Sequence, residues 1–255
     1  KINLEYEDFT NQVYVQTVFN RKFAIGAGVE HKRIKAFTET TSTVENNILA
    51  SKNGRFYFDK SDYLNGIAYI KIDTYDKKYF QKKGVYFDTR FTWYWGSTDY
   101  SKSFSPFSQL KGKLGYAYTF SNNLTAHFTS EAGITIGTNT NQALDFIVGG
   151  YGNNFINNFI PMFGYDFGEL REDSFLKSAL TLRYEFLPKN YVSASANFAR
   201  VENDIFNEGR IFDNTKSGFM VGYGLDTFLG PIEVNYTWSP DQKSKNWYFN
   251  VGYWF

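Results

Sequence analysis

The feature that most constrains this chain is a regular alternation of side-chain character at its C-terminal end. Across residues 247–255 the odd positions are aromatic or aliphatic, whereas the even positions include Asn250 and Gly252. Successive side chains of a strand point to opposite faces, so this stretch predicts a strand with one apolar and one polar face. Residues 232–238 repeat the pattern, with Glu233 and Asn235 between the apolar positions.

The alternation continues through the rest of the chain. It predicts about eleven strands, most of them near the ~9–11 residues that a tilted strand needs to cross a bilayer. They cover residues 11–19, 23–30, 64–73, 85–95, 110–120, 124–136, 180–186, 192–198, 219–226, 232–238 and 247–255.

The predicted connections between these strands alternate in length. Tight turns near 20–21, 121–123, 188–190 and 230–231 exchange with long polar loops at about 38–55, 96–108, 137–174 and 202–216. Short periplasmic turns and long external loops are typical of outer-membrane barrels. The turn around Asp76, Lys77 and Lys78 is longer and more charged than the other short turns.

The composition agrees with strands that cross a membrane. No run of ~18 apolar residues is present, which excludes a transmembrane helix. The chain is 20% aromatic, with 27 Phe and 20 Tyr, enough to supply aromatic girdles at two bilayer interfaces. The net charge of +1 and the lack of a basic run argue against nucleic-acid binding. We therefore predict an all-β, transmembrane, antiparallel meander β-barrel in the bacterial outer membrane, in contact with its lipid.

A soluble β-sandwich is the alternative, because it also alternates and buries one face of each sheet. Its aromatic face would be the core, and the charged positions would form its solvated face. Parity alone does not separate the two folds. In a barrel the charged positions line the lumen: Lys71, Asp73, Asp88, Arg90, Lys111, Lys113, Glu131, Arg183, Glu185, Asp226 and Glu233.

The number of strands bears on whether the barrel is complete. A closed bacterial single-chain barrel has an even number of strands, and eleven is odd. Ile2, Leu4 and Tyr6 alternate in even parity whereas Phe9 and Val13 are odd, so we expect a bulge or small turn near Asp8. Either residues 2–7 form a twelfth strand, or the chain is a fragment whose earlier strands lie upstream.

The C-terminal end resembles a known family of outer-membrane proteins. The run from Gly230 to Tyr236, followed by a final strand ending at Phe255, is similar to the last hairpin of the BamA/TamA surface-antigen superfamily. The aromatic final strand also resembles the β-signal read by the barrel-assembly machinery, which implies that machinery as a partner during biogenesis. The residues of this signal would be Phe249, Val251, Tyr253 and Phe255.

A second resemblance lies in the long loop 137–174. The superfamily carries a lumen-inserted sixth loop with a Val/Ile-Arg-Gly-Phe/Tyr motif, and the corresponding residues here are Val148, Gly149, Gly150 and Tyr151. Gly149 stands at the Arg position, which removes the guanidinium that would pair with an acidic residue inside the barrel. We expect Arg183 and Glu185 on the following strand either to dock this loop or to belong to an ordinary charge ladder.

The Gly-Gly form of the loop is most similar to barrels fused to patatin-like phospholipases of Bacteroidetes. Residues 28–31 (Gly-Val-Glu-His) and 164–166 (Gly-Tyr-Asp) add to this resemblance. It implies a barrel of about sixteen strands, of which this domain of residues 1–255 would hold roughly the last eleven. It also implies a phospholipase domain upstream.

No catalytic residue is expected in this chain. Patatin-type hydrolysis needs a Gly-x-Ser-x-Gly nucleophile elbow, which is absent. Two His and no Cys leave no clustered metal site, and we expect neither a metal nor a cofactor. His127 and Glu131 share a parity and could form an acid/base pair, although a solvated lumen histidine is the favoured interpretation. The glycines of 149–152 are better explained by a loop bending into the barrel than by phosphate binding.

Four functions follow. The favoured one is a barrel that anchors an upstream patatin-like phospholipase or helps to display it. The second is a BamA/TamA-type insertase or translocase that opens between its first and last strands. The third is a passive pore constricted by residues 137–174, and the fourth is a small lipid-active enzyme that uses His127. Fused N-terminal domains or a second copy of the chain are further candidate partners.

Overall fold

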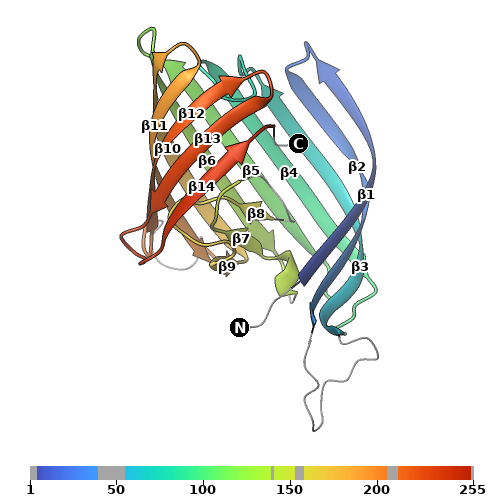
Figure 1. The fold of residues 1–255 in the computed structure, drawn as a ribbon. Helices are drawn as coiled ribbons and strands as arrows, with labels where there is room; N and C mark the ends of the chain where they lie inside the picture. The colour runs from blue at the N-terminus through green and yellow to red at the C-terminus, as the bar shows by residue number, and fades with distance from the viewer. Residues whose placement is uncertain (1–4, 40–54, 139–140, 153–157, 206–211, 254–255) are drawn as a thin grey trace.

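A computed structural model describes residues 5–39, 55–138, 141–152, 158–205 and 212–253. Their main feature is an 11-stranded antiparallel sheet that curls around a lumen (Figure 1). Each strand pairs with the next along the chain, except that β6 pairs with β10 across the long loop. The predicted meander of about eleven strands is confirmed. Its strands are β1 (Glu5–Phe19), β2 (Phe23–Glu39), β3 (Arg55–Asp73), β4 (Gly84–Ser97), β5 (Phe107–Thr119), β6 (Leu124–Ile136), β10 (Ser174–Leu187), β11 (Asn190–Glu202), β12 (Lys216–Thr227), β13 (Gly230–Trp238) and β14 (Lys245–Val251).

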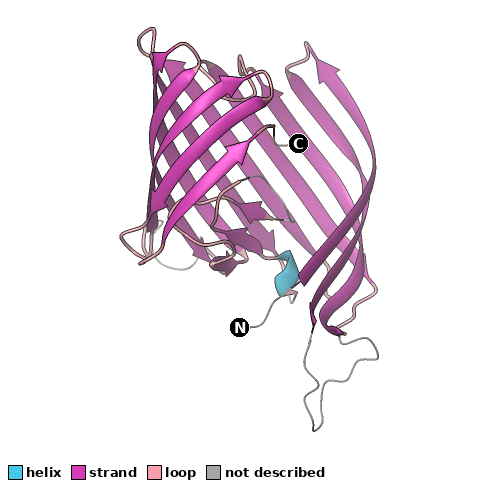
Figure 2. Cartoon of the chain, in the orientation of Figure 1, coloured by secondary structure: helices cyan, strands magenta, loops and turns pink. Residues whose placement is uncertain are grey.

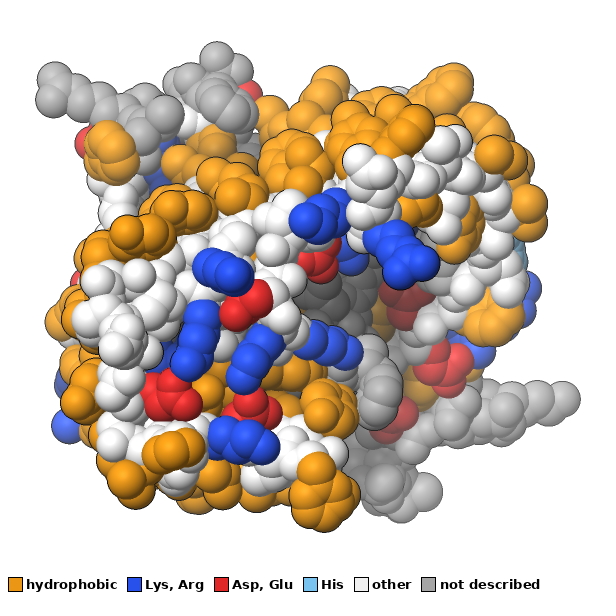
Figure 3. Space-filling view, turned by 90° about the horizontal axis from the view of Figure 1, so that it is seen from above, with side chains coloured by type: hydrophobic (Ala, Val, Ile, Leu, Met, Phe, Trp, Pro, Cys, Tyr) orange, Lys and Arg blue, Asp and Glu red, His pale blue; other side chains and the backbone are white. Residues whose placement is uncertain are grey.

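Side chains are distributed over the two faces in the reverse of a soluble fold. On the outer face Val13 is 76% exposed and Val15 is 81% exposed, whereas Glu30 and Asn65 on the inner face are buried. Seen from the end that carries the short turns, charged side chains gather toward the interior and most of the rim is hydrophobic (Figure 3). Contact with water would leave this large apolar surface exposed at a cost in free energy, whereas contact with lipid is favourable. The β-sandwich alternative is therefore excluded.

The short turns are tight because their residues take the conformations that such turns require. Asn20 and Arg21 both have positive φ, 49° and 56°, and close the β1–β2 hairpin. Two consecutive positive φ values are the mark of a type I′ turn, whose twist matches that of the flanking strands. Lys189, with φ of 65°, serves the β10–β11 turn in a similar way. Residues 74–83, between β3 and β4, form the longest of the connections at this end.

The prediction of a bulge or small turn near Asp8 is wrong. β1 pairs with β2 without a register shift from Glu5 opposite Phe37 to Phe19 opposite Phe23. Tyr6 keeps the inward parity of Asp8, and its hydroxyl donates to the carbonyl oxygen of Ala143 at 3.3 Å. An aromatic ring at a lumen position thus contacts the long loop, so no bulge is needed to turn it outward. Residues 5–7 belong to β1, and residues 2–4 of the proposed twelfth strand lie outside the described residues.

The final strand is shorter than predicted. β14 ends at Val251, which faces Ile232. β13 begins at Gly230, only two residues before Ile232, so beyond Val251 the final strand has almost no β13 residues to pair with. Phe249, Val251 and Tyr253 are exposed, as an outward-facing signal requires, and Phe255 lies outside the described residues.

Residues of the long loop form a small second sheet. β7 (Phe146–Val148) pairs in parallel with β8 (Phe159–Ile160) and antiparallel with β9 (Leu170–Glu172). The 3₁₀ turn η1 (Gln142–Leu144) precedes it (Figure 2). Among the described residues no helix is long and apolar enough to cross a membrane.

Candidate functional site in the lumen loop

The described part of loop 137–174 is packed against the inner face of the main sheet. Its apolar core consists of Phe146, Val148, Ile160, Met162 and Tyr165, which cluster with Phe175 of β10 and Ala199 of β11. The rings of Phe146 and Phe175 meet edge to face, with centroids 5.0 Å apart. Because these side chains are buried between the loop and the inner face of the sheet, the loop is folded and lies inside the lumen.

The motif Val148, Gly149, Gly150 and Tyr151 lies at the end of β7. Gly149 has φ of 134°, and a Cβ placed on it would stand 2.3 Å from the carbonyl oxygen of Asp166. Its N–H donates to the Ile160 carbonyl at 3.0 Å, and the Gly150 N–H donates to the Tyr165 carbonyl at 2.9 Å. The backbone therefore cannot accept an Arg at position 149, and neither glycine N–H is left to bind a phosphate.

Tyr151 attaches this motif to the far wall of the lumen. Its hydroxyl donates to Glu233 Oε2 at 3.3 Å and accepts a hydrogen bond from Asn235 Nδ2 at 2.8 Å. The ring stacks on Tyr248 of β14 with centroids 4.9 Å apart. Burial, followed by the charge of Glu233, raises the pKa of the Tyr151 phenol far above its usual range, so the phenol stays a hydrogen-bond donor.

These partners of Tyr151 were not singled out from the sequence. Glu233 was assigned to the lumen only as one charge among many, and Asn235 only as a polar position of its strand. The inward parity of both residues on β13 is the signal in the sequence that could have identified them as partners of a lumen loop. The contact with Tyr248 depends on the curl of the sheet, which no local pattern contains.

A second attachment holds residues 163–166 to the external ends of β12–β14. The hydroxyl of Tyr165 donates to Asp241 Oδ2 at 3.1 Å, and Asn246 Nδ2 donates to Asp166 Oδ1 at 2.7 Å. The N–H of Ser217 also donates to Asp241 at 2.6 Å, and this bond holds the pKa of Asp241 below its usual range. Burial raises the pKa of Tyr165 to about 12.

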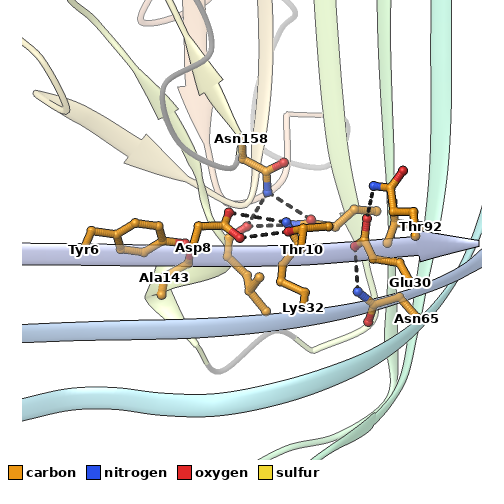
Figure 4. Close-up of polar contacts among 12 residues, drawn as sticks. Tyr6, Asp8, Thr10, Glu30, Lys32, Asn65, Thr92, Ala143 and Asn158 are labelled. Atoms are coloured by element: carbon orange, nitrogen blue, oxygen red, sulfur yellow. Dashed lines mark hydrogen bonds and ion pairs between the residues drawn. The ribbon is translucent and has the colours of Figure 1, made fainter.

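The opposite side of the loop is bound to the first strands. Gln109 Nε2 of β5 donates to the Leu144 carbonyl at 2.8 Å, and Asn158 Nδ2 donates to Gln109 Oε1 at 3.0 Å. Asn141 Nδ2 donates to Asp59 of β3 at 2.6 Å. Figure 4 shows Ala143 and Asn158 of the loop beside Tyr6 and Asp8 of β1. The loop thus contacts β1, β3 and β5 on one side of the lumen and β13 and β14 on the other.

Arg183 and Glu185 lie elsewhere. Arg183 Nη1 donates to the Gln81 carbonyl at 3.2 Å, and its guanidinium lies 5.2 Å from the centroid of the Phe80 ring. Glu185 Oε2 accepts a 2.5 Å bond from Lys82 Nζ. Both residues contact the 74–83 connection, near the end of β10 that is remote from the long loop. The structure does not bring them to the motif they were expected to dock.

His127 and Glu131 are not brought together as an acid/base pair. His127 Nε2 is hydrogen-bonded to the hydroxyl of Tyr75 at 2.8 Å. Glu131 is buried and lies 3.2 Å from Lys177 Nζ and 3.4 Å from Lys113 Nζ. Within the described ranges no group of three potential metal ligands is found.

A comparison with models of known protein families identifies the superfamily of this chain. A model described as the OMP85 superfamily matches residues 1–255. The chain belongs to the OMP85 superfamily. It is accordingly an outer-membrane barrel domain of that superfamily, with the lipid-facing exterior described above.

A solved OMP85-type barrel has a similar fold. BamA from Haemophilus ducreyi, in a crystal structure that lacks POTRA domains 1–3, superposes with a TM-score of 0.68 at 10% sequence identity. The alignment covers 96% of this chain and 53% of that chain, so this chain spans about half the length of the BamA structure. No curated protein sequence matches the chain.

Proposed function

We propose that this OMP85-superfamily barrel anchors and displays a patatin-like phospholipase domain that the same protein carries upstream, and is not itself the enzyme. The observation that carries the proposal is how the lumen is occupied. The long loop crosses it and is attached to both walls, and the lumen histidine is engaged by Tyr75 instead of Glu131. A lumen held in this way supports the role of a rigid anchor more than that of a pore.

The loop motif supports the patatin-linked branch in particular. The Gly-Gly form distinguishes this chain from barrels with Arg in the motif, and the backbone at Gly149 requires it. A rigid loop bound through Tyr151 to Glu233 replaces an Arg–carboxylate anchor with a phenol–carboxylate one. Such an uncharged donor needs less desolvation inside the lumen than a guanidinium.

The insertase or translocase is the second candidate. The likeness in fold to the BamA barrel favours this candidate.

Phospholipase assays on the full-length protein from outer membranes test the proposal. We expect hydrolysis of a fluorogenic phospholipid that is lost when the serine of an upstream Gly-x-Ser-x-Gly element is changed to Ala. His127→Ala should leave this rate unchanged within about twofold, as should the matched control His31→Ala, which changes the other histidine of residues 1–255.

Two outcomes would contradict the anchoring role. Loss of hydrolysis with His127→Ala but not with His31→Ala would make the barrel the enzyme. No hydrolysis by the wild type, together with fewer folded outer-membrane barrels after its depletion, would favour the insertase.

A further inference from the structure

The connection between β3 and β4 does not form a simple turn at the rim. Residues 74–83, here called the strap, make contacts across the lumen with strands on its far side. Tyr75 near its start reaches His127 of β6, and Lys82 near its end reaches Glu185 of β10. Between them Lys77 Nζ lies 3.3 Å from Asp226 Oδ2 of β12. A simple turn between two neighbouring strands would not contact β6, β10 and β12.

Phe80 is the apolar anchor of the strap. It is 5% exposed and stacks on Tyr191 of β11, with ring centroids 4.5 Å apart and planes 14° apart. A Cβ on Gly224 of β12 would stand 2.6 Å from Phe80 Cε1, so the ring fills the space that this glycine leaves open. The guanidinium of Arg183 lies 5.2 Å from the same ring. The inner wall at this end is thus shaped to receive one aromatic side chain of the strap.

The strap is also organised within itself. Asp76 Oδ1 accepts hydrogen bonds from the backbone N–H groups of Lys82 and Lys83 at 2.9 and 3.2 Å. Gln81 Nε2 donates to the Lys78 carbonyl at 2.6 Å. These bonds close the segment into a compact unit.

The contacts that hold the unit to the wall differ in strength. The lysine side chains of the Lys77–Asp226 and Lys82–Glu185 pairs are 43% and 34% exposed, and ion pairs as open to solvent as these are weak and screened by salt. Phe80 is the one deeply buried side chain of the strap. Hydrogen bonds of Tyr75 with His127, of Arg183 with the Gln81 carbonyl and of Thr119 with the Lys82 carbonyl complete the attachment. A segment with one buried ring, and otherwise held by polar contacts, makes few buried apolar contacts, as movable elements of a structure do.

We propose that residues 74–83 are a releasable plug that closes the short-turn end of the lumen, independently of the long loop at the other end. Short turns lie on the periplasmic side in outer-membrane barrels, so the plug controls entry from the periplasm. Its seat is formed by Tyr191, Glu185 and Asp226. The strap and the long loop therefore close the lumen separately, and only the strap is releasable.

Cysteine labelling tests the plug, since residues 1–255 contain no Cys and any cysteine elsewhere in the full-length protein would first be changed to Ser. Ala117 is 1% exposed and lies opposite His127, the partner of Tyr75, in the β5–β6 register. It stands on β5 between Gly115, which Tyr75 approaches, and Thr119, which donates to the Lys82 carbonyl. Ala199 is also 1% exposed but lies in the core of the long loop. In the full-length protein in outer-membrane fragments, Ala117→Cys and Ala199→Cys would each be treated with a membrane-impermeant thiol reagent.

Two variants open the strap and one leaves it seated. Phe80→Ala removes the buried ring, and Lys82→Glu turns one ion pair into a repulsion. We expect either change to speed labelling of Ala117→Cys by at least about tenfold and to leave Ala199→Cys unchanged. Adding Glu185→Lys to Lys82→Glu should restore slow labelling. The matched control Lys83→Glu makes the same charge change on an exposed lysine of the strap and should have no effect.

The results that would overturn the plug are equally definite. Fast labelling of Ala117→Cys with the wild-type strap would show that this end of the lumen is open. Slow labelling in both Phe80→Ala and Lys82→Glu, in barrels that keep their heat-modifiable mobility, would show that the strap is not releasable. Equal acceleration at Ala117 and Ala199 would mean that the variants loosen the whole barrel.

Discussion

At the residue scale, one close approach of the backbone decides which residue type is tolerated at a position of the loop motif. Gly149 stands where the superfamily motif has Arg, and the structure gives the reason in the 2.3 Å distance from its missing Cβ to the Asp166 carbonyl oxygen. The loop keeps an attachment to an acidic residue of the wall, but through the Tyr151 hydroxyl and Glu233. The substitution at one position and the anchor at another are thus parts of one arrangement.

A Gly149→Ala substitution should loosen the loop. A Cβ at a φ of 134° adds backbone strain to a collision with Asp166, which we expect to cost about 2–3 kcal/mol. The free energy of unfolding in urea, measured in lipid vesicles, gives this cost. Gly112→Ala is the control, because the nearest atom to its Cβ is 3.7 Å away and the change should be neutral or slightly stabilising. Equal effects at the two positions would refute the steric argument.

At the element scale, the long loop is a folded unit whose stability depends on charge. Asp145, between η1 and β7, has its pKa raised to about 7 by burial and then by the neighbouring carboxylate of Asp173, while Arg171 acts in the opposite direction. An acid whose pKa is higher in the folded protein binds its proton more tightly there. The folded loop is therefore favoured at low pH, and this contribution is lost as the pH rises through about 7.

Raising the pH from 5 to 8 should make the loop open more readily. We expect the free energy of local opening at Phe146 and Val148 to fall by about 1–2 kcal/mol, after allowance for solvent screening of a half-buried group. Hydrogen exchange corrected for the intrinsic rate at each pH measures it. In Asp145→Asn the dependence should disappear, and an unchanged slope in that variant would assign it to another group.

At the scale of the whole molecule, the sheet has its apolar face outside and its charges inside. Leu182 and Val221 are each 45% exposed on the outer surface, whereas Lys177 and Glu131 are buried as a pair on the inner one. Water is unfavourable for the apolar outer face, and an ordinary apolar core is unfavourable for the charged inner face. A bilayer around the curled sheet satisfies the outer face, and the lumen loop and strap cover much of the inner face.

Arginine substitutions on the outer surface should respond to depth in the membrane. Leu182→Arg, within β10, should destabilise the barrel in vesicles by about 2–4 kcal/mol, because the charge lies in hydrocarbon. Phe228→Arg, in the β12–β13 turn where Phe228 is 88% exposed, should cost about 0–1 kcal/mol. Urea titrations of the two variants compare them, and equal costs would contradict the membrane orientation.

The strands, their order and the face that each side chain takes could be predicted from the amino-acid sequence, because a period of two is a local property of extended backbone. The sequence also located the loop motif and the longer, charged turn around Asp76, Lys77 and Lys78. The tertiary structure decided which wall residues the motif meets, and it moved Arg183 and Glu185 from the long loop to the strap. It likewise placed Tyr6 inside, against Ala143. These contacts join residues 82 to 137 positions apart. They depend on the curl of the sheet and on which strands it sets face to face across the lumen.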